Sequence, residues 1–169
     1  HGKGVMVVRN DAGRFSNPVF VNLSGGSFGP QIGAQSTDVV LVFTTRKGVE
    51  GITDGKVTLG ADASVAAGPV GRQATAATDA SFKAEVYSYS RSKGLFAGVA
   101  LDGSAITIDD KSNAAFYGKK ASAGEILKGS VSTNSNGAQR FLAAVSASTS
   151  PVAATATPTA EAPANPPAQ

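Results

Sequence analysis

Ser27 lies in the spacing that most closely resembles a catalytic motif. Residues 25–29 read Gly-Gly-Ser-Phe-Gly, which matches the G-x-S-x-G pattern of a hydrolase nucleophile elbow. That chemistry needs a strand before the serine, a helix after it and a downstream histidine as general base. The single histidine is His1, and Pro30 with a β-like run stands where the helix should begin. The sequence therefore favours a glycine loop between strands and predicts no catalytic residue and no enzymatic activity.

The same loop and one acidic cluster could instead hold an ion. Residues 25–30 lack the Lys-Ser/Thr pair of a P-loop and the glycine spacing of a dinucleotide site, so a loose anion nest is the alternative that stays open. Asp109, Asp110 and Asn113 offer oxygen atoms to a cation, but their spacing is not that of an EF-hand and a helix cap is expected there. Cysteine is absent, which excludes thiolate metal sites and disulfides. The sequence predicts no cofactor and no metal.

Basic residues beside predicted turns are the candidate binding groups. They are Arg46, Lys47, Arg72, Arg91 and Lys93. These side chains could contact anionic lipid headgroups, or they could be solvated loop charges, and the sequence leaves both interpretations open. The chain carries a net charge of +3, and one Lys or Arg near an anionic membrane contributes roughly 1 kcal/mol. Charge alone therefore predicts weak attachment to lipid and argues against binding of nucleic acid.

A β-rich domain must position these groups. The chain has 169 residues, of which 41% are hydrophobic and 20 are glycine, a composition typical of strands joined by tight turns. Pro18 indicates an edge strand, the run at residues 39–43 predicts a strand buried on both faces, and Asp102-Gly103 predicts a hairpin turn. The predicted strands cover residues 4–9, 15–23, 39–43, 56–68, 82–89, 94–101 and 104–108.

Helices are predicted at residues 46–52 and again after residue 108. Ser122 and Glu125 match a capping box, and Phe141, Leu142 and Val145 recur at helical spacing. The predicted fold class is α+β and β-dominated, with a curved antiparallel sheet or barrel-like core covered by short C-terminal helices. Residues 1–145 form the expected domain, and residues 146–169 form an Ala-, Thr- and Pro-rich tail that we expect to be disordered.

No run of about 18 apolar residues predicts a membrane span. The chain opens inside a strand pattern at His1 rather than with a signal peptide. We therefore expect a processed or truncated protein that lacks an upstream segment.

Several stretches, taken together, resemble the SYLF domain, also called the Ysc84-type actin-binding or lipid-binding domain. The resemblance covers about residues 2–128 in the order of the family, and the stretch at residues 87–98 is its most specific part. The similar stretches are Asn-Pro-Val-Phe at 17–20, Gly-Ala-Gln-Ser-Thr-Asp-Val-Val at 33–40, Leu-Gly-Ala-Asp-Ala-Ser at 59–64, Gly-Pro-Val-Gly-Arg at 68–72, Tyr-Ser-Tyr-Ser-Arg-Ser-Lys-Gly-Leu-Phe-Ala-Gly at 87–98 and Phe-Tyr-Gly at 116–118.

This resemblance implies a non-enzymatic protein that binds phosphoinositides or other lipids. Eukaryotic members carry SH3 or FYVE modules and act at actin-rich membrane sites, whereas bacterial members are exported or lipoprotein-anchored. The tail at residues 146–169 resembles the bacterial kind. The family domain begins with an upstream segment that includes a membrane-binding amphipathic helix, and this chain starts after it.

The expected function is therefore binding of an anionic lipid or membrane surface, in a bacterial cell envelope, by a periplasmic or secreted protein peripheral to the membrane. The five basic residues named above are the candidate headgroup contacts. The alternative is a structural or protein-interaction module of the envelope that binds another envelope protein or associates with itself, through a sheet edge exposed by the missing segment.

Overall fold

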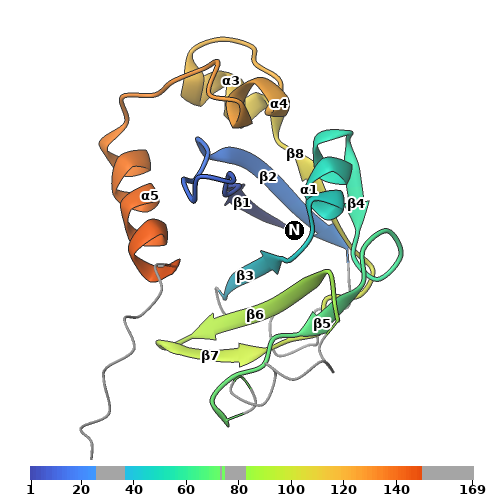
Figure 1. Cartoon of the computed structure of the whole chain (residues 1–169). Helices are drawn as coiled ribbons and strands as arrows, with labels where there is room; N and C mark the ends of the chain where they lie inside the picture. Colours follow the sequence, from blue (N-terminus) through green and yellow to red (C-terminus); the bar gives the residue numbers. More distant parts are fainter. Residues whose placement is uncertain (26–36, 73, 75–82, 150–169) are drawn as a thin grey trace, which may run out of the picture.

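A computed structural model describes residues 1–25, 37–72, 74 and 83–149. Within them the chain forms two four-stranded sheets and short helices, which confirms a β-dominated α+β fold (Figure 1). The two sheets do not close into a barrel in the part that is described. The elements are β1 (Gly2–Met6), β2 (Val19–Gly25), β3 (Asp38–Phe43), α1 (Arg46–Thr53), β4 (Lys56–Thr58), β5 (Val65–Ala67), β6 (Val86–Ser92), β7 (Leu95–Gly98), β8 (Ser104–Ile108), α3 (Asp110–Tyr117), α4 (Ala123–Leu127) and α5 (Asn136–Thr149).

The first sheet has the strand order β1-β2-β8-β4 and is antiparallel throughout. The sequence prediction that residues 15–23 form an edge strand was wrong, because β2 lies between β1 and β8. Strand β2 begins at Val19, directly after Pro18, so the proline stays outside the hydrogen-bonded ladder and does not limit the strand to an edge.

The second sheet is organised around β6. Strand β3 pairs antiparallel along one side of β6, while the other side pairs first with β5, in parallel, and then with β7, antiparallel. The predicted hairpin between residues 94–101 and 104–108 was wrong, because β7 pairs with β6 and β8 belongs to the first sheet. The Asp102-Gly103 turn is present, but it carries the chain from one sheet to the other.

The main hydrophobic core lies between the two sheets. It joins Val86 of β6 to Val57 of β4 and Ile106 of β8, with Ile52 of α1 and Leu101 also buried among them. A smaller cluster packs Ala123 and Ile126 of α4 against Val19 at the start of β2. The sheets are therefore held face to face by apolar side chains from both, and α4 packs on the end of the first sheet.

Strand β3 is half exposed, contrary to the prediction of burial on both faces. Val39, Leu41 and Phe43 pack against the core, whereas Val40 and Val42 are 41% and 47% exposed. The continuous apolar run suggested layers on both sides of the strand, but β3 ends its sheet among the described residues and contacts the core with alternate side chains.

The remaining boundaries differ in smaller ways. The predicted strand over residues 56–68 is two strands, β4 and β5, separated by a turn in which Asp62 accepts a hydrogen bond from the Thr58 N–H. Asp54 and Gly55 connect helix α1 to strand β4. Helix α5 continues through residues 146–149, and the rest of the predicted tail lies outside the described residues.

Two glycines allow β5 and β7 to lie against the same stretch of β6. A Cβ on Gly98 would overlap the backbone of Gly68, and a Cβ on Gly68 would overlap the ring of Tyr89. Tyr89 is the register partner of Gly98, and its hydroxyl donates to the Pro69 carbonyl at 3.3 Å. The chain after β5 can pass the β6–β7 pair only where side chains are missing.

We predict that Gly98→Ala lowers the free energy of unfolding by about 1–3 kcal/mol, because the added methyl group overpacks a backbone contact. Urea denaturation measures this change. Gly2→Ala is the matched control, since no atom lies within 4 Å of its Cβ position. Equal stability of the two variants would contradict the packing described for Gly98.

Candidate functional site

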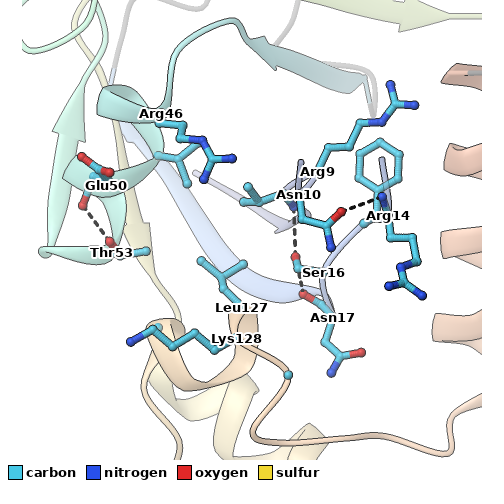
Figure 2. A pocket seen from close by; sticks show the side chains of 15 residues that line it. Arg9, Asn10, Arg14, Ser16, Asn17, Arg46, Glu50, Thr53, Leu127 and Lys128 are labelled. Carbon is cyan, nitrogen blue, oxygen red and sulfur yellow. Dashed lines mark hydrogen bonds between the residues drawn. The ribbon is translucent and has the colours of Figure 1, made fainter. Parts of the chain in front are cut away.

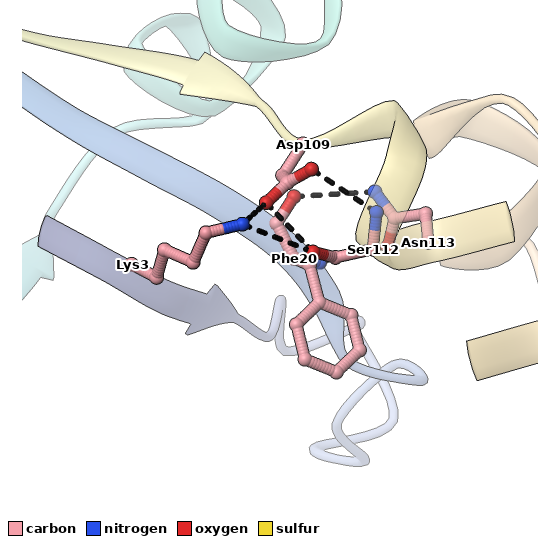
Figure 3. A network of polar contacts seen from close by, with 5 residues as sticks. All are labelled: Lys3, Phe20, Asp109, Ser112 and Asn113. Atoms are coloured by element: carbon pink, nitrogen blue, oxygen red, sulfur yellow. Dashed lines mark hydrogen bonds and ion pairs between the residues drawn. The ribbon is translucent and has the colours of Figure 1, made fainter. Parts of the chain in front are cut away.

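A polar network joins the first sheet to helix α3 (Figure 3). Lys3 of β1 donates to Asp109 at 2.5 Å, and the Ser112 hydroxyl donates to the same carboxylate at 2.7 Å. The Ser112 backbone N–H donates to the other Asp109 oxygen at 3.0 Å, so Asp109 caps α3 as the sequence predicts. These bonds satisfy the carboxylate from three directions and give it a structural role.

Charge and hydrogen bonding stabilise the ionised form of Asp109. The Lys3 ammonium group, followed by the Ser112 hydroxyl and backbone N–H, lowers the pKa of Asp109 from 3.8 to about 2. The carboxylate remains ionised wherever the fold persists above that pH. It therefore holds β1 against α3 over the whole neutral range.

Asn113 completes this junction from inside the protein. Its side chain is fully buried, accepts from the Phe20 N–H at 2.8 Å and donates to the Phe20 carbonyl at 3.2 Å. The amide thus replaces a strand partner for β2 at the point where the strand meets α3. Losing a buried hydrogen-bond partner of this kind costs about 1–3 kcal/mol. This structural role accounts for a buried asparagine at position 113, and no bound ligand is needed to explain it.

The other candidate motifs either have a structural role or lie outside the described residues. Ser27 lies outside the described residues, as does most of its motif. Ser122 and Glu125 form the predicted capping box of α4, and the Ser122 contacts lower the pKa of Glu125. No cluster of metal-binding side chains occurs among the residues that the structure describes. Their helices also include none that is long and apolar enough to cross a membrane.

The structure divides the candidate basic residues between two ends of the second sheet. Arg91 ends β6 and Lys93 lies in the β6–β7 turn. Arg72 follows β5, which runs parallel to β6 and so leads toward that same end. Arg46 and Lys47 follow β3, which is antiparallel to β6, and therefore lie at the opposite end. All five side chains are exposed, but they do not form one surface.

The β6–β7 turn combines positive charge with exposed apolar side chains. Lys93 and Gly94 form a two-residue loop with φ values of 50° and 81°, a geometry that suits the twist of a hairpin. Leu95 is 77% exposed and Phe96 is 53% exposed. The Arg91 guanidinium lies 5.8 Å from the centre of the Phe96 ring. We call Arg91, Lys93, Leu95 and Phe96 the hairpin tip, which lies at the left edge of the lower sheet in Figure 1.

Arg46 belongs to a different group of cations. It lines a cleft together with Arg9, Arg14 and Lys128 (Figure 2). The sequence reasoning did not connect these residues because they come from three distant segments. One indication was present in the sequence, because residues 10–13 (Asn-Asp-Ala-Gly) have the composition of a turn. Arg9 and Arg14 flank the turn that the structure shows there.

Comparison with known proteins identifies relatives of this chain. Residues 24–148 match the Ysc84 family, described as Las17-binding protein actin regulator. "LAS seventeen-binding protein 3" of Saccharomyces cerevisiae is 42% identical over 133 residues, which cover 77% of this chain and 29% of that protein. "SH3 domain-containing YSC84-like protein 1" of Homo sapiens is 35% identical over 129 residues, covering 76% and 38%. The chain thus spans less than two fifths of these curated relatives, and no solved structure matches it.

We predict that the Asp109 junction weakens the fold in acid. The folded-state pKa is depressed, so the stabilisation is complete above about pH 4 and disappears as the pH falls toward about 2. Urea unfolding at a series of pH values should show this loss in the parent protein and a smaller loss in Asp109→Asn, which can still cap the helix but does not titrate. Asp110→Asn is the control for removing a neighbouring carboxylate. A pH dependence that Asp109→Asn leaves unchanged would contradict the assignment.

Proposed function

The chain belongs to the Ysc84 family, and from that premise we propose that it is a non-enzymatic domain that binds anionic lipid or membrane surfaces through the hairpin tip. The observation that carries the proposal is the exposure of Leu95 and Phe96 directly beside Arg91 and Lys93. A membrane surface offers apolar contact and negative charge in adjacent layers. The hairpin tip offers the complementary pair of properties within one turn.

The expected strength of this contact follows from its parts. Burying the exposed portions of Leu95 and Phe96 contributes about 2–4 kcal/mol. Arg72, Arg91 and Lys93 near an anionic surface contribute about 3 kcal/mol together. The sum of about 5–7 kcal/mol corresponds to a dissociation constant between roughly millimolar and micromolar. The hairpin tip would therefore give reversible attachment, and a second membrane contact would be needed for a stable one.

A protein-binding role is the second candidate. It is supported by the names of the relatives, one of which is a LAS seventeen-binding protein, and by strand β3. Val40 and Val42 are exposed on this outer strand, a position at which another strand could add to the sheet. The partner would be another protein or a second copy of the chain. Light scattering that shows a mass rising with concentration, and a return to the monomer in Val42→Lys, would favour this role.

We also propose a location in a bacterial cell envelope, periplasmic or secreted and peripheral to the membrane. The support is the Ala-, Thr- and Pro-rich composition of residues 146–169, which resembles exported bacterial members of the family. Fractionation of the native host tests this proposal, and recovery in the cytosol would contradict it.

We predict that Leu95→Ser combined with Phe96→Ser lowers affinity for anionic liposomes by about tenfold or more, because the apolar contribution is lost. Lys93→Gln should lower affinity less and weaken its dependence on salt. Liposome flotation at increasing salt measures both effects. Val5→Ser, which removes an exposed valine on β1, is the control. Equal recovery on anionic and neutral liposomes, unaffected by salt, would count against the hairpin tip and its basic residues.

A further inference from the structure

Strand β3 forms one outer edge of the second sheet among the described residues, with β6 along its other side (Figure 1). The Thr44 N–H donates to the Glu85 carbonyl at 2.9 Å, which continues the antiparallel β3–β6 ladder. Because residues of an antiparallel strand bond alternately to one side and the other, the even-numbered residues of β3 direct their main-chain groups toward β6. The main-chain N–H and C=O groups of Val39, Leu41 and Phe43 therefore point away from β6, to the outer edge.

This outer edge lacks the features that usually keep sheet edges apart. Edge strands of monomeric proteins commonly carry a lysine, a proline or a bulge that prevents another strand from pairing. Residues 39–43 read Val-Val-Leu-Val-Phe, with no charge and no proline, and they pair with β6 in an unbroken register. Strand β1, at an edge of the first sheet, carries Lys3 at its second position. Of these two edges, β3 is thus the one open to strand addition.

Exposed apolar side chains extend along the outer face of the same strand. Val40 and Val42 are 41% and 47% exposed. Their register partners on β6 are Tyr89 and Tyr87, so each valine extends a cross-strand pair toward the outer edge. A partner strand with two apolar side chains, one residue apart on the same face, would bury both valines. A second copy of β3 meets this requirement.

An antiparallel pair of β3 strands centred on Leu41 is self-complementary. In this register the outward-facing main-chain groups meet, with Leu41 opposite its own copy and Val39 opposite Phe43 of the second copy. Val40 then lies opposite Val42 of the second copy, and the two-fold symmetry repeats this pair, so four valines come together. Centring the pair on Val39 or Phe43 would extend it beyond the ends of β3, so Leu41 gives the largest number of paired residues.

Charge at the strand ends favours the antiparallel orientation. Asp38 begins β3 and is exposed, whereas Arg46 and Lys47 follow the strand at its other end. Antiparallel pairing places the acidic end of each strand beside the basic end of the other, whereas parallel pairing would place the two Asp38 carboxylates together. Arg46 also pairs with Asp11 of its own copy. Because these groups are exposed, their charges determine orientation more than strength.

Within the protein-binding role proposed above, on which this pairing rests, we propose that the partner is a second copy of the chain, held by antiparallel pairing of the two β3 strands. Each copy contributes one six-residue strand, fewer than the roughly 20–30 residues per partner of a standard interface. The dimer is therefore weak, with a dissociation constant of roughly 10 μM to 1 mM. Asp38 is the register partner of Arg91, so the two hairpin tips lie at opposite ends of the joined sheet, outside the paired strands.

The chain contains no cysteine, which allows a register-specific test by cross-linking. Under mild oxidation, ¹⁵N-labelled Val40→Cys mixed with unlabelled Val42→Cys should give mixed disulfide dimers that outnumber either like dimer by at least about tenfold, against roughly twofold for random collision. Paired positions have Cβ atoms roughly 4.5–5.5 Å apart, near disulfide spacing, whereas like positions are diagonal neighbours about 7–8 Å apart. Mass spectrometry counts the products, and Val5→Cys, at an exposed valine on β1, is the control thiol.

Sedimentation equilibrium of the full chain, from about 10 μM to 1 mM, measures the association without cross-linking. The mass of the parent protein should rise toward that of a dimer. Val42→Lys should weaken the association by at least about tenfold, because it places a charge against Val40 of the second copy. Val5→Lys is the matched control and should associate like the parent protein. Thermal melts confirm that each variant is folded.

A monomer at every concentration overturns the self-pairing and leaves β3 to a strand of another protein, so the broader protein-binding role is not lost with it. A dimer that persists in Val42→Lys, or cross-links in random proportions, also overturns the pairing, because the contact then lies elsewhere. Leu95→Ser with Phe96→Ser should associate like the parent protein. Failure of the hairpin tip in liposome flotation and failure of the β3 pairing are therefore separate results.

Discussion

Burial of apolar side chains between the two sheets holds the fold together. Val57 and Ile106 of the first sheet pack with Val86 of the second, and Ile52 holds α1 against them. Because the sheets present their inner faces to this core, the groups available for binding are confined to strand ends, turns and outer faces. The hairpin tip and the cleft lined by Arg46 both lie at the ends of strands.

Two sets of specific contacts fix the arrangement of elements around the hydrophobic core. At Gly68 and Gly98 the missing side chains let the chain after β5 approach the β6–β7 pair. At Asp109 and Asn113, polar groups tie β1 and β2 to α3, so α3 and α4 stay packed at one end of the first sheet. The glycine and aromatic stretches through which the sequence resembles its family therefore also make packing contacts in this fold.

The topology of β6 explains why the basic residues form two groups. Strand β3 is antiparallel to β6 and delivers the chain to α1, while β5 is parallel and β7 returns from the far end. Arg46 is thereby carried to the cleft, and Arg91 and Lys93 to the hairpin tip. One end combines cations with exposed Leu95 and Phe96, whereas at the other end exposed cations line an open cleft.

Features that depend on neighbouring residues could be predicted from the amino-acid sequence. These include the β-dominated fold class, the turn at residues 10–13, the capping box at Ser122, the Asp109 cap and the family, because turn chemistry, capping and motif spacing are local. The tertiary structure was needed to establish which strands pair, that β2 is internal, that β3 is half exposed and that Arg9, Arg14, Arg46 and Lys128 line one cleft. The periodicity of apolar residues indicates how often a side chain points inward. It carries no information about which distant segment covers that side chain, because this depends on packing across the whole chain.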